Sequence, residues 1–542
     1  MELSALSLLT AAIAVAYGVL YIAYGYVRVL YLRRRMPPGP FPFPVFGNIF
    51  QITPVRHWMQ FEEWSHTYKS PIITIWEGRR PTVVCNDAWS MSELCDKRAN
   101  IYSSRAIKNV SGKIFGLHKF NQAGLPYGEQ WKVHRRLTHA AANAQVVQTY
   151  RPVQEWEAKI LAFDCMRNPE MLVDNLLRFT VSLASIVAWG RRIKVHDDGV
   201  LKVARGFVGS ANLGFPGKTY TEAIPELMHL PQWLNPLPNM VRRLAQTSNK
   251  YFYALCVEAQ ESSQDNFAKR LLREKQEQGL TKIEIANLTG NFIGGGVDTT
   301  TSTILSFMLA MILHPDIQKK AQQEIDAVVG PDQSPTWSHQ SELPYLTAIL
   351  TETLRWRPAF PLGGPPHAPI ADDIYEQYLI PKGTSVIGNL HAISRNPREY
   401  PQPERFWPDR FLDDFDKPPY PNKRGHHTFG WGRRVCSGEP LVHQSMFIIA
   451  VNFLWAFNIR PGLDDKGREV FPDPKAYGVS QVSSPLPFRV RLEPRSEAIK
   501  DMLTEDAAAA TLGLQAYDGE TRVTFESAQS VSLDMPVARA EA

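Results

Sequence analysis

The first 35 residues combine a long apolar run with basic residues on one side only. No charged residue occurs between positions 3 and 27; Arg28 and three arginines at 33–35 follow, whereas only Glu2 precedes the run. A helix of this length can cross a hydrocarbon layer of about 30 Å. Basic flanks stay in the cytosol, so the pattern predicts a single-pass anchor over residues 1–35 with the body of the chain cytosolic. A cleaved signal peptide is the alternative, but its basic residues would precede the apolar run.

Behind the anchor, the apolar spacing changes from mainly helical to short alternating segments. From residue 57 to about residue 360, apolar residues recur at intervals of three and four, with Pro and Gly at the breaks. Residues 72–87 alternate as a β-hairpin does, and residues 375–391 contain two short strands about a turn. We therefore expect a mainly α fold with small β-sheets over residues 36–495. Residues 496–542 are rich in alanine, acidic and poor in large apolar side chains, which predicts a flexible tail.

Composition and charge narrow the class of protein. The 542 residues are 44% hydrophobic and 21% charged, as in a globular protein with a large core. The net charge of +5 arises from 59 basic and 54 acidic residues along the chain, so we expect no nucleic-acid partner. The five cysteines form no CxxC pair, and neither a disulfide framework nor a zinc ribbon is indicated.

A long apolar helix with a weak centre is expected to begin at Thr281, which has capping-box spacing to Glu284. Three consecutive glycines at 294–296 each cost about 1 kcal/mol relative to alanine, so we expect a ligand to approach the backbone there. Asp298 and Thr299 follow and place an acid and a hydroxyl beside that face, as a proton-delivering site requires. The alternative is a helix kinked for packing, with its hydroxyls bonded back to carbonyls.

An acid and an arginine share one face of another predicted helix. Glu352 and Arg355 are three residues apart, and the helix ends before Pro358. Arg405 lies in the proline-walled stretch PQPERFWPDRF and could bring a second guanidinium to Glu352. A buried set of one acid and two arginines would be a structural lock and not a catalyst.

A single cysteine lies in the stretch FGWGRRVCSGEP, residues 429–440. A metal-binding thiolate must be deprotonated, shielded and fixed in direction. The glycines allow tight turns that aim amides at the sulfur of Cys436, and Pro440 suits the first turn of the apolar helix that follows, whose positive end would stabilise a thiolate. One thiolate without neighbouring ligands cannot form a zinc or iron–sulfur site, but it suffices as the axial ligand of a haem.

Together these stretches resemble the motifs of the cytochrome P450 family, of the microsomal and fungal type. The resemblance covers residues 36–492 in family order and implies one large helical haem domain, where length alone allows several domains. The haem-ligand loop of the family is matched by Phe429, Gly432, Arg434, Cys436 and Gly438, and its oxygen-activating motif by Gly295, Gly296, Asp298, Thr299 and Thr300. The ExxR motif is matched by Glu352 and Arg355, and the PERF loop by Pro403, Glu404, Arg405 and Phe406. Trp131 and Arg135 match the WxxxR helix that binds a haem propionate in the family. His367 falls where the family often places a third propionate partner.

The resemblance implies a haem b cofactor and a monooxygenase reaction. Cys436 is then the iron ligand, and Thr299 and Asp298 organise the protons used in the activation of dioxygen. Two other functions remain open: an oxygen-independent haem-thiolate isomerase or dehydratase, and a non-catalytic membrane haem-binding protein. Neither of these needs the acid–threonine pair.

The implied partners are a reductase and a membrane. An NADPH-cytochrome P450 reductase is expected to supply electrons, since the chain has no flavin or nicotinamide domain of its own. Lys423, Arg424 and Arg433 could offer it a positive surface, with ordinary solvated charge as the alternative. The implied location is the endoplasmic reticulum membrane.

The resemblance is least informative about the substrate. The apolar, proline-rich residues 225–240 suit contact with a bilayer and entry of a lipophilic compound, with core packing as the alternative. Pocket walls are expected from residues 101–120, from Asn291, Phe292 and Gly295, from residues 359–364 and from the region of residues 477–479. The haem region is similar to fungal enzymes of secondary metabolism, including those that hydroxylate small polyketide phenols of the m-cresol kind.

Overall fold

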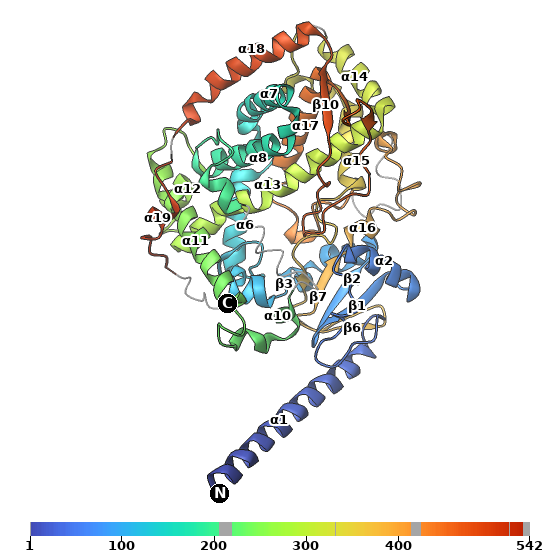
Figure 1. The fold of residues 1–542 in the computed structure, drawn as a ribbon, viewed down its shortest axis with the longest axis vertical. Coiled ribbons are helices and arrows are strands. Elements are labelled where there is room, and N and C mark those ends of the chain that lie inside the picture. The colour runs from blue at the N-terminus through green and yellow to red at the C-terminus, as the bar shows by residue number, and fades with distance from the viewer. Residues whose placement is uncertain (1, 205–218, 331, 413–423, 520, 535–542) are drawn as a thin grey trace.

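The computed structural model describes residues 2–204, 219–330, 332–412, 424–519 and 521–534. Most of these residues are helical, and the small β-sheets lie in separate parts of the body (Figure 1). The predicted fold class is confirmed. The helices are α1 (Glu2–Arg33), α2 (His57–Thr67), α3 (Ala88–Ser92), α4 (Ala99–Tyr102), α5 (Leu117–Phe120), α6 (Glu129–Ala142), α7 (Arg151–Arg167), α8 (Leu172–Trp189), α10 (Tyr220–Ala223), α11 (Leu237–Glu258), α12 (Phe267–Glu274), α13 (Lys282–Leu313), α14 (Pro315–Val329), α15 (Pro344–Trp356), α16 (Leu390–Ile393), α17 (Glu439–Ala456), α18 (Glu497–Gly513) and α19 (Phe525–Ala528).

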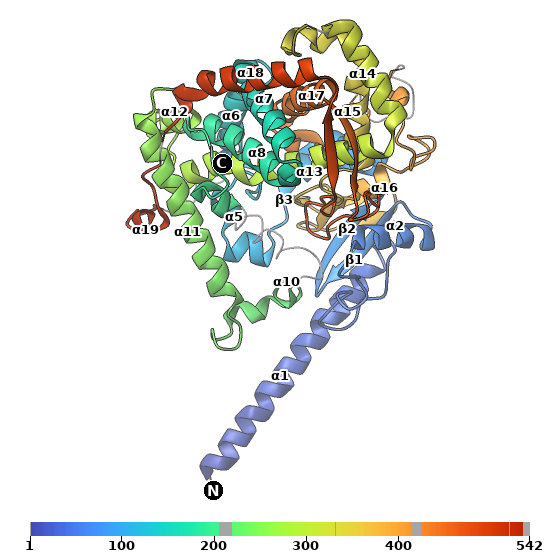
Figure 2. The ribbon, with the colours of Figure 1, turned by 45° about the horizontal axis from the view of Figure 1, so that its top comes forward.

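The long helix α13 runs through the middle of the body, with α8, α15 and α17 packed against it (Figures 1 and 2). It begins as predicted: Thr281 and Glu284 form a capping box, in which each side chain accepts a hydrogen bond from the other residue's backbone N–H. Buried aromatic residues such as Phe179, Phe307 and Phe447 fill the space between these helices. This core encloses α13 from Ile304 onward, directly after the segment that carries the glycines and the acid–threonine pair.

Helix α1 projects from the body, and its apolar part, Ser7–Arg33, is almost entirely unburied (Figures 1 and 2). Two other helices, Pro169–Trp189 and Lys282–Leu313, are also long and apolar enough to span a membrane, but they are mostly buried inside the protein. The C-terminal end of α1 docks on the body through the buried side chain of Val29 and a hydrogen bond from the Tyr26 hydroxyl to the Pro42 carbonyl (3.1 Å). The first helix is therefore the candidate membrane anchor.

The sheets confirm the predicted hairpin and refine the second strand region. The strands are β1 (Ile72–Glu77), β2 (Arg80–Cys85), β3 (Ser104–Arg105), β4 (His367–Ala368), β5 (Asp373–Tyr375), β6 (Tyr378–Ile380), β7 (Ser385–Gly388), β8 (Phe457–Leu463), β9 (Glu469–Val470) and β10 (Val490–Pro494). The largest sheet has the order β1-β2-β7-β4-β3, with β1 and β2 forming the hairpin. Strands β6 and β7 flank the turn at Pro381, but they belong to different sheets, since β6 pairs with β5 and β7 runs parallel to β2.

Residues 496–519 and 521–534 differ from the expected flexible tail. Ser496 accepts a hydrogen bond from the amide of Ile499 and caps α18, which packs lengthwise on α7 (Figure 1). Leu503, Ala507 and Ala510 form the buried stripe of α18. Composition concealed this helix because its buried face is mostly alanine, and small side chains let two helices pack closely without large apolar residues. Over residues 496–519 and 521–534, this segment is part of the folded body.

Candidate functional site

The loop that carries Cys436 is held in one conformation by backbone contacts. Gly432 has φ of 57°, and a Cβ added there would lie 2.1 Å from the carbonyl oxygen of Cys95, so only glycine fits. The amide of Cys436 donates to the carbonyl of Phe429 (2.9 Å) and closes the loop. The Phe429 ring lies 5.1 Å from the ring of His443, which anchors the start of the loop on α17.

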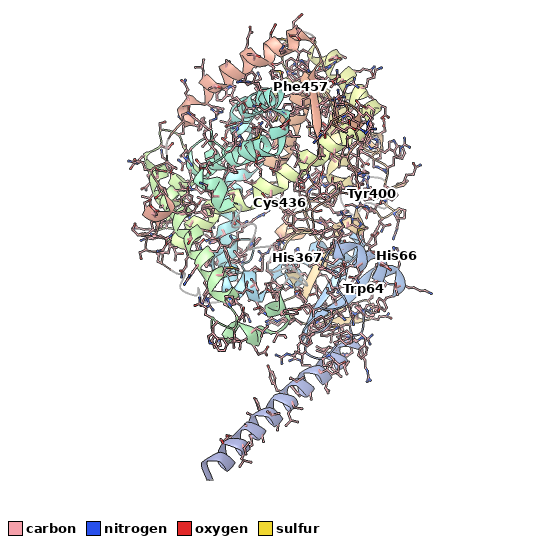
Figure 3. All side chains as sticks on the ribbon, in the orientation of Figure 1. Trp64, His66, His367, Tyr400, Cys436 and Phe457 are labelled. Carbon is pink, nitrogen blue, oxygen red and sulfur yellow. The ribbon has the colours of Figure 1, made fainter. Side chains whose placement is uncertain are left out.

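The sulfur of Cys436 lies deep in the protein and is nevertheless accessible (Figure 3). Burial raises the pKa of this thiol, while backbone N–H groups of Gly438 and Glu439 lower it by bonding to the sulfur. Those amides belong to the start of α17, which has Pro440 in its first turn. A Cβ at Gly438 would lie 3.8 Å from the sulfur, an ordinary contact, so the contribution of position 438 to the sulfur is its backbone amide. The sulfur thus lies at the N-terminus of α17, where two backbone amides bond to it.

Two arginines lie beside this loop without a carboxylate partner among the described residues. Arg434 donates to the carbonyls of Ser103 (2.7 Å) and Leu125 (2.7 Å) and lies over the ring of Trp131 (4.3 Å). Arg135 donates to the carbonyl of Val435 (2.8 Å). Burial and the neighbouring Arg105 and Arg135 lower the pKa of Arg434 to about 8, and burial lowers that of Arg135.

A third arginine, Arg105, completes this group, and sequence reasoning missed it. It lies directly opposite His367 on the antiparallel strands β3 and β4, and burial lowers its pKa to about 10. Its Nη1 donates to the carbonyl of Pro365 (2.6 Å), while its buried Nε–H has no acceptor among the described residues. A strand of two residues leaves no periodic signal, so only the position of Arg105 within the expected pocket wall could have indicated it.

His367 is neutral in this arrangement. Its pKa is held well below the ordinary value by burial and by Arg105 and Arg434. Its Nδ1 lies 3.0 Å from the carbonyl oxygen of Tyr102, which can only accept, so Nδ1 carries the proton and Nε2 is an acceptor. His367 can therefore donate to an anion through Nε2 only after it gains a second proton, which a nearby carboxylate would favour.

The glycine stretch of α13 borders open space. A Cβ built on Gly295 or Gly296 would meet no atom within 4 Å, and Gly295 is exposed. The hydroxyl of Thr299 donates to the carbonyl of Gly295 (2.7 Å), and Asp298 is half-buried beside it. The open face at the glycines is what a close ligand would need. The Thr299 hydroxyl that bonds back to a helix carbonyl is instead the feature expected of the alternative, a helix shaped only for packing. α13 is continuous through this stretch.

One turn before Gly295, a chain of side-chain amides fixes the direction of Asn291. The amide of Ala123 donates to Asn121 Oδ1 (2.9 Å), so the Asn121 NH2 group must be the donor to Asn287 Oδ1 (2.9 Å) and to Asn291 Oδ1 (2.8 Å). The NH2 group of Asn291 is left as a donor, and it has no acceptor among the described residues. Because Asn291 is half-buried and one helical turn from Gly295, this donor can serve a ligand on the glycine face.

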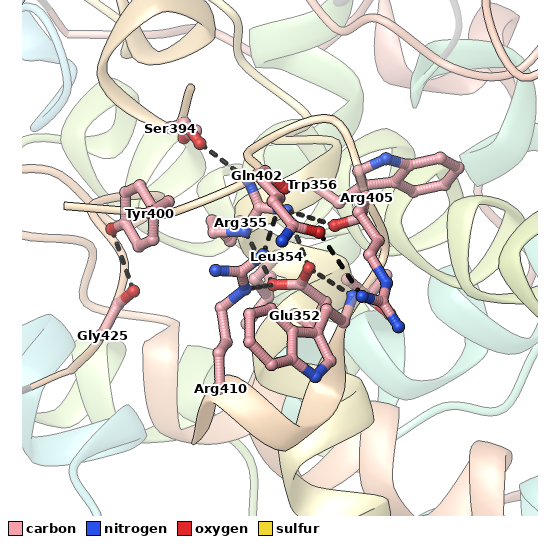
Figure 4. Close-up of polar contacts among 12 residues, drawn as sticks. Glu352, Leu354, Arg355, Trp356, Ser394, Tyr400, Gln402, Arg405, Arg410 and Gly425 are labelled. Carbon is pink, nitrogen blue, oxygen red and sulfur yellow. Dashed lines mark hydrogen bonds and ion pairs between the residues drawn. The ribbon is translucent and has the colours of Figure 1, made fainter. Parts of the chain in front are cut away.

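The acid–arginine lock forms as predicted, but its second arginine is Arg410 and not Arg405 (Figure 4). Arg355 holds Glu352 through two hydrogen bonds of 2.7 Å, and both side chains are fully buried. Arg410 Nε lies 3.3 Å from Glu352 Oε2. The backbone carbonyl of Arg405 accepts from Arg355 (3.4 Å), while its guanidinium points away toward Gln402. The loop turns between the two arginines, and the sequence does not reveal in which direction.

The lock also supports the cysteine loop. Arg355 donates to the carbonyl of Ser394 (2.7 Å), and the hydroxyl of Thr428 donates to the carbonyl of Leu354 on the same helix (2.9 Å). Thr428 immediately precedes Phe429, so α15 fixes the start of the loop. The role of the lock is structural, as its chemistry predicted.

The predicted basic surface near the cysteine loop is only partly available. Lys423 lies outside the described residues. Arg424 forms an ion pair with Glu439 (2.8 Å), which reduces its free positive charge. Arg433 is exposed and donates to the neutral hydroxyl of Tyr127 (2.7 Å), so it keeps its charge.

These residues fit a haem. The accessible sulfur suits an axial thiolate, and the open face at Gly295 leaves room for a flat ring. Arg105, Arg135 and Arg434 carry positive charge that no described carboxylate balances, and the Nε–H of Arg105 lacks an acceptor. The two propionates of a haem would supply both the charge and the acceptors.

Comparison with known proteins agrees with this fit. The family model described as Cytochrome P450 matches residues 37–486. Cytochrome P450 monooxygenase 58 of Postia placenta is 34% identical over 91% of this chain and 94% of its own length. Cytochrome P450 monooxygenase fogE of Aspergillus ruber is 32% identical over 85% of this chain and 87% of its own length. Cytochrome P450 monooxygenase COX2 of Coprinopsis cinerea is 32% identical over 88% of this chain and 92% of its own length.

Proposed function

Because this chain belongs to the cytochrome P450 family and is a monooxygenase like its fungal relatives, we propose that it hydroxylates a small lipophilic metabolite at a membrane. The observation that carries the proposal is the accessible sulfur of Cys436 beside arginines that lack a carboxylate. Cys436 would bind the iron of haem b, and Arg105, Arg135, Arg434, Trp131 and His367 would hold its propionates. When bound, the haem supplies the iron at which dioxygen is reduced and one oxygen atom is transferred.

Thr299 and Asp298 are the residues that would deliver protons. The net reaction consumes two electrons and two protons for each hydroxyl inserted, and the second oxygen atom leaves as water. The Thr299 hydroxyl donates to a helix carbonyl, and rotation about its side-chain torsion would turn it toward the open glycine face. Asp298 directly precedes Thr299, and because it is only half-buried it can exchange protons with water.

The site favours a lipophilic substrate with one acceptor oxygen. Asn291 presents an NH2 donor whose direction is fixed by Asn121, so a hydroxyl or carbonyl oxygen can be held one helical turn from Gly295. A phenol of the m-cresol kind, as in fungal secondary metabolism, meets both conditions. Polar groups set to bond a substrate oxygen discriminate against analogues that lack it.

The substrate proposal is tested with purified holoenzyme and its reductase on m-cresol and on toluene. We expect hydroxylation of the phenol, and an Asn291→Leu variant should raise KM for it by about 2- to 12-fold, the value of one neutral hydrogen bond. Toluene turnover should change less. Equal KM for both proteins would exclude Asn291 as the donor, and no turnover of any phenol in a panel would exclude this substrate class.

A membrane surface and a reductase are the proposed partners, at the endoplasmic reticulum. Trp233 is 80% exposed, and Leu234, Met240 and Phe50 are also exposed apolar side chains on the body. They support contact of residues 225–240 with the bilayer into which α1 inserts. Arg433, which keeps its charge, is the favoured contact for an acidic reductase surface. An Arg433→Glu change should therefore slow electron transfer more than Arg424→Glu, measured by stopped-flow reduction.

Two measurements separate the monooxygenase from the other functions. Carbon monoxide added to the reduced protein should give a thiolate-type spectrum that is lost in Cys436→Ser. Replacement of Thr299 by Ala should divert electrons from hydroxylation to peroxide at constant NADPH consumption. Unchanged product yield in that variant would contradict the role of Thr299, and product formation without oxygen would favour an isomerase or dehydratase.

A further inference from the structure

The residues after α18 cross the outside of the helical body as an extended strap. We use this name for residues 514–519 and 521–534. The strap leaves α18 beside α8, where the carbonyl of Tyr517 accepts from the amide of Arg192 (2.9 Å) and Asp518 pairs with Lys194 (2.6 Å). The segment is therefore attached to the body from its first residues onward.

The middle of the strap packs on α11. Glu258 accepts hydrogen bonds from the Thr521 hydroxyl (2.7 Å) and the Arg522 amide (2.6 Å). In α19, the ring of Phe525 stacks on that of Tyr251 with centroids 4.8 Å apart and planes 22° apart. Ala528 is fully buried, and three further apolar side chains of the strap, Val523, Val531 and Leu533, pack against the same hydrophobic cluster.

The end of the strap reaches the first turn of α13. Asp534 Oδ1 accepts from the amide of Lys282 (2.7 Å), and the carbonyl of Ser532 accepts from Lys282 Nζ (3.2 Å). First-turn amides have no acceptor within their own helix, and the positive helix end favours a carboxylate. Asp534 thus satisfies a donor of the helix that carries Thr299.

The same turn of α13 is joined to α6. Glu284 accepts from Gln130 Nε2 (2.8 Å) and lies 3.0 Å from His134 Nε2. Helix α6 also carries Trp131 and Arg135, which would hold the haem. The strap therefore ends at the junction that sets the glycine face of α13 relative to the haem-binding residues.

Helices α11 and α13 meet closely beneath the strap. The amides of Asn249 and Asn287 bond (2.9 Å), and a Cβ on Gly290 would lie 2.6 Å from the Phe252 ring. Asn287 is also bonded to Asn121, which orients Asn291. A shift of α11 would therefore be passed to the substrate-facing amide.

We propose that the strap positions α11 and α13 for the monooxygenase reaction, with Phe525 and Asp534 as positioning residues. Phe525 holds α11 on α13 through Tyr251, and Asp534 fixes the first turn of α13 against α6. The proposal rests on the monooxygenase activity and not on the identity of the substrate. Its consequence is that damage to the strap changes the space at the glycine face while haem binding persists.

The test uses full-length holoenzyme with Phe525→Ala and Asp534→Ala. Asp534→Asn keeps an acceptor oxygen and serves as the conservative variant, and Glu526→Ala, at an exposed residue of α19, serves as the matched control. The readouts are hydrogen–deuterium exchange of α11 and of the first turns of α13, haem content, and the affinity for phenylimidazole, which binds haem iron and fills the adjacent space. None of these depends on the proposed substrate.

We expect both alanine variants to keep their haem, to exchange faster in α11 or α13, and to change phenylimidazole affinity by about 2- to 10-fold. Asp534→Asn should restore most of the change, and Glu526→Ala should match the unaltered protein. Faster exchange confined to the strap with unchanged phenylimidazole affinity would overturn the proposal. If Phe525→Ala does not take up haem, the difference between Asp534→Ala and Asp534→Asn decides.

Discussion

Two groups of buried or half-buried arginines in this protein have opposite charge balance. In the lock, Arg355 and Arg410 share the carboxylate of Glu352, which also accepts the amide of Trp407 (2.8 Å). Around the cysteine loop, the arginines donate to backbone carbonyls, and burial lowers the pKa of Arg105 to about 10. The first group is complete within the chain, whereas the second has its charge unbalanced among the described residues.

On the proposed function, the difference separates residues that hold the fold from residues that would hold a ligand. Removing a charge from water is costly unless a partner of opposite sign replaces the water. Glu352 is that partner in the lock. For Arg105, Arg135 and Arg434 no described residue is that partner, and the propionates of the proposed haem have the required charge. In the haem-free protein, loss of the Glu352 carboxylate should therefore lower the free energy of unfolding. Loss of an arginine from the second group should leave the free energy of unfolding unchanged or raise it.

The largest effect is expected from Glu352→Gln, which makes the lock resemble the other group. Two buried guanidinium groups then lack a carboxylate, and loss of one partner of a buried ion pair costs about 3–5 kcal/mol. The free energy of unfolding measured in urea should fall, and so should the fraction of the protein that gives the thiolate-type carbon monoxide spectrum. Glu342→Gln, at an exposed carboxylate, is the control. A Glu352→Gln protein as stable as the control would contradict the structural role of the lock.

A smaller effect of different kind is expected from Arg105→Met. Haem affinity should fall by about 10- to 150-fold, the value of a charge-assisted hydrogen bond of about 1.5–3 kcal/mol. The haem-free protein should be as stable as before or more stable, because one poorly solvated charge is gone. Haem loss to apomyoglobin and urea unfolding of the haem-free protein measure the two quantities, with Arg80→Met as control. Loss of stability without loss of haem affinity would mean that Arg105 stabilises the fold and does not bind the haem.

These contrasts also explain how far the sequence alone could lead. The capping box of α13 and the hairpin β1–β2 were predictable because their signals lie within a few neighbouring residues. Arg105 was missed because its strand pairs with one more than 250 residues later. The small-residue stripe of α18 was missed because composition does not reveal which alanines face a partner helix.

Arg410 and Arg405 lie in the same loop, but only the guanidinium of Arg410 contacts Glu352. Replacing each in turn therefore compares an arginine of the lock with a neighbouring arginine outside it. Arg410→Met leaves Glu352 with one cation, and we expect a loss of about 1–2 kcal/mol in the free energy of unfolding. Arg405→Met removes an exposed guanidinium whose hydrogen bond to Gln402 is long (3.4 Å), and the loss should be below about 0.5 kcal/mol. Urea unfolding of both variants ranks them. The reverse order would restore Arg405 as the second arginine of the lock.

The smallest effect concerns Glu284, a buried acid that is satisfied without any guanidinium. Hydrogen bonds from His134, Thr281 and Gln130 outweigh burial and lower its pKa from 4.5 to about 2. A lowered folded pKa gives stability that is present above pH 4.5 and is lost as the pH falls toward about 2. Between neutral pH and about pH 4, the stability gap between the unaltered protein and Glu284→Gln should therefore narrow, by no more than ~1 kcal/mol after solvent screening. Urea unfolding of both proteins across this range measures the gap. A gap independent of pH would mean that the junction of α6 and α13 does not depend on the charge of Glu284, and that an uncharged acceptor there serves equally well.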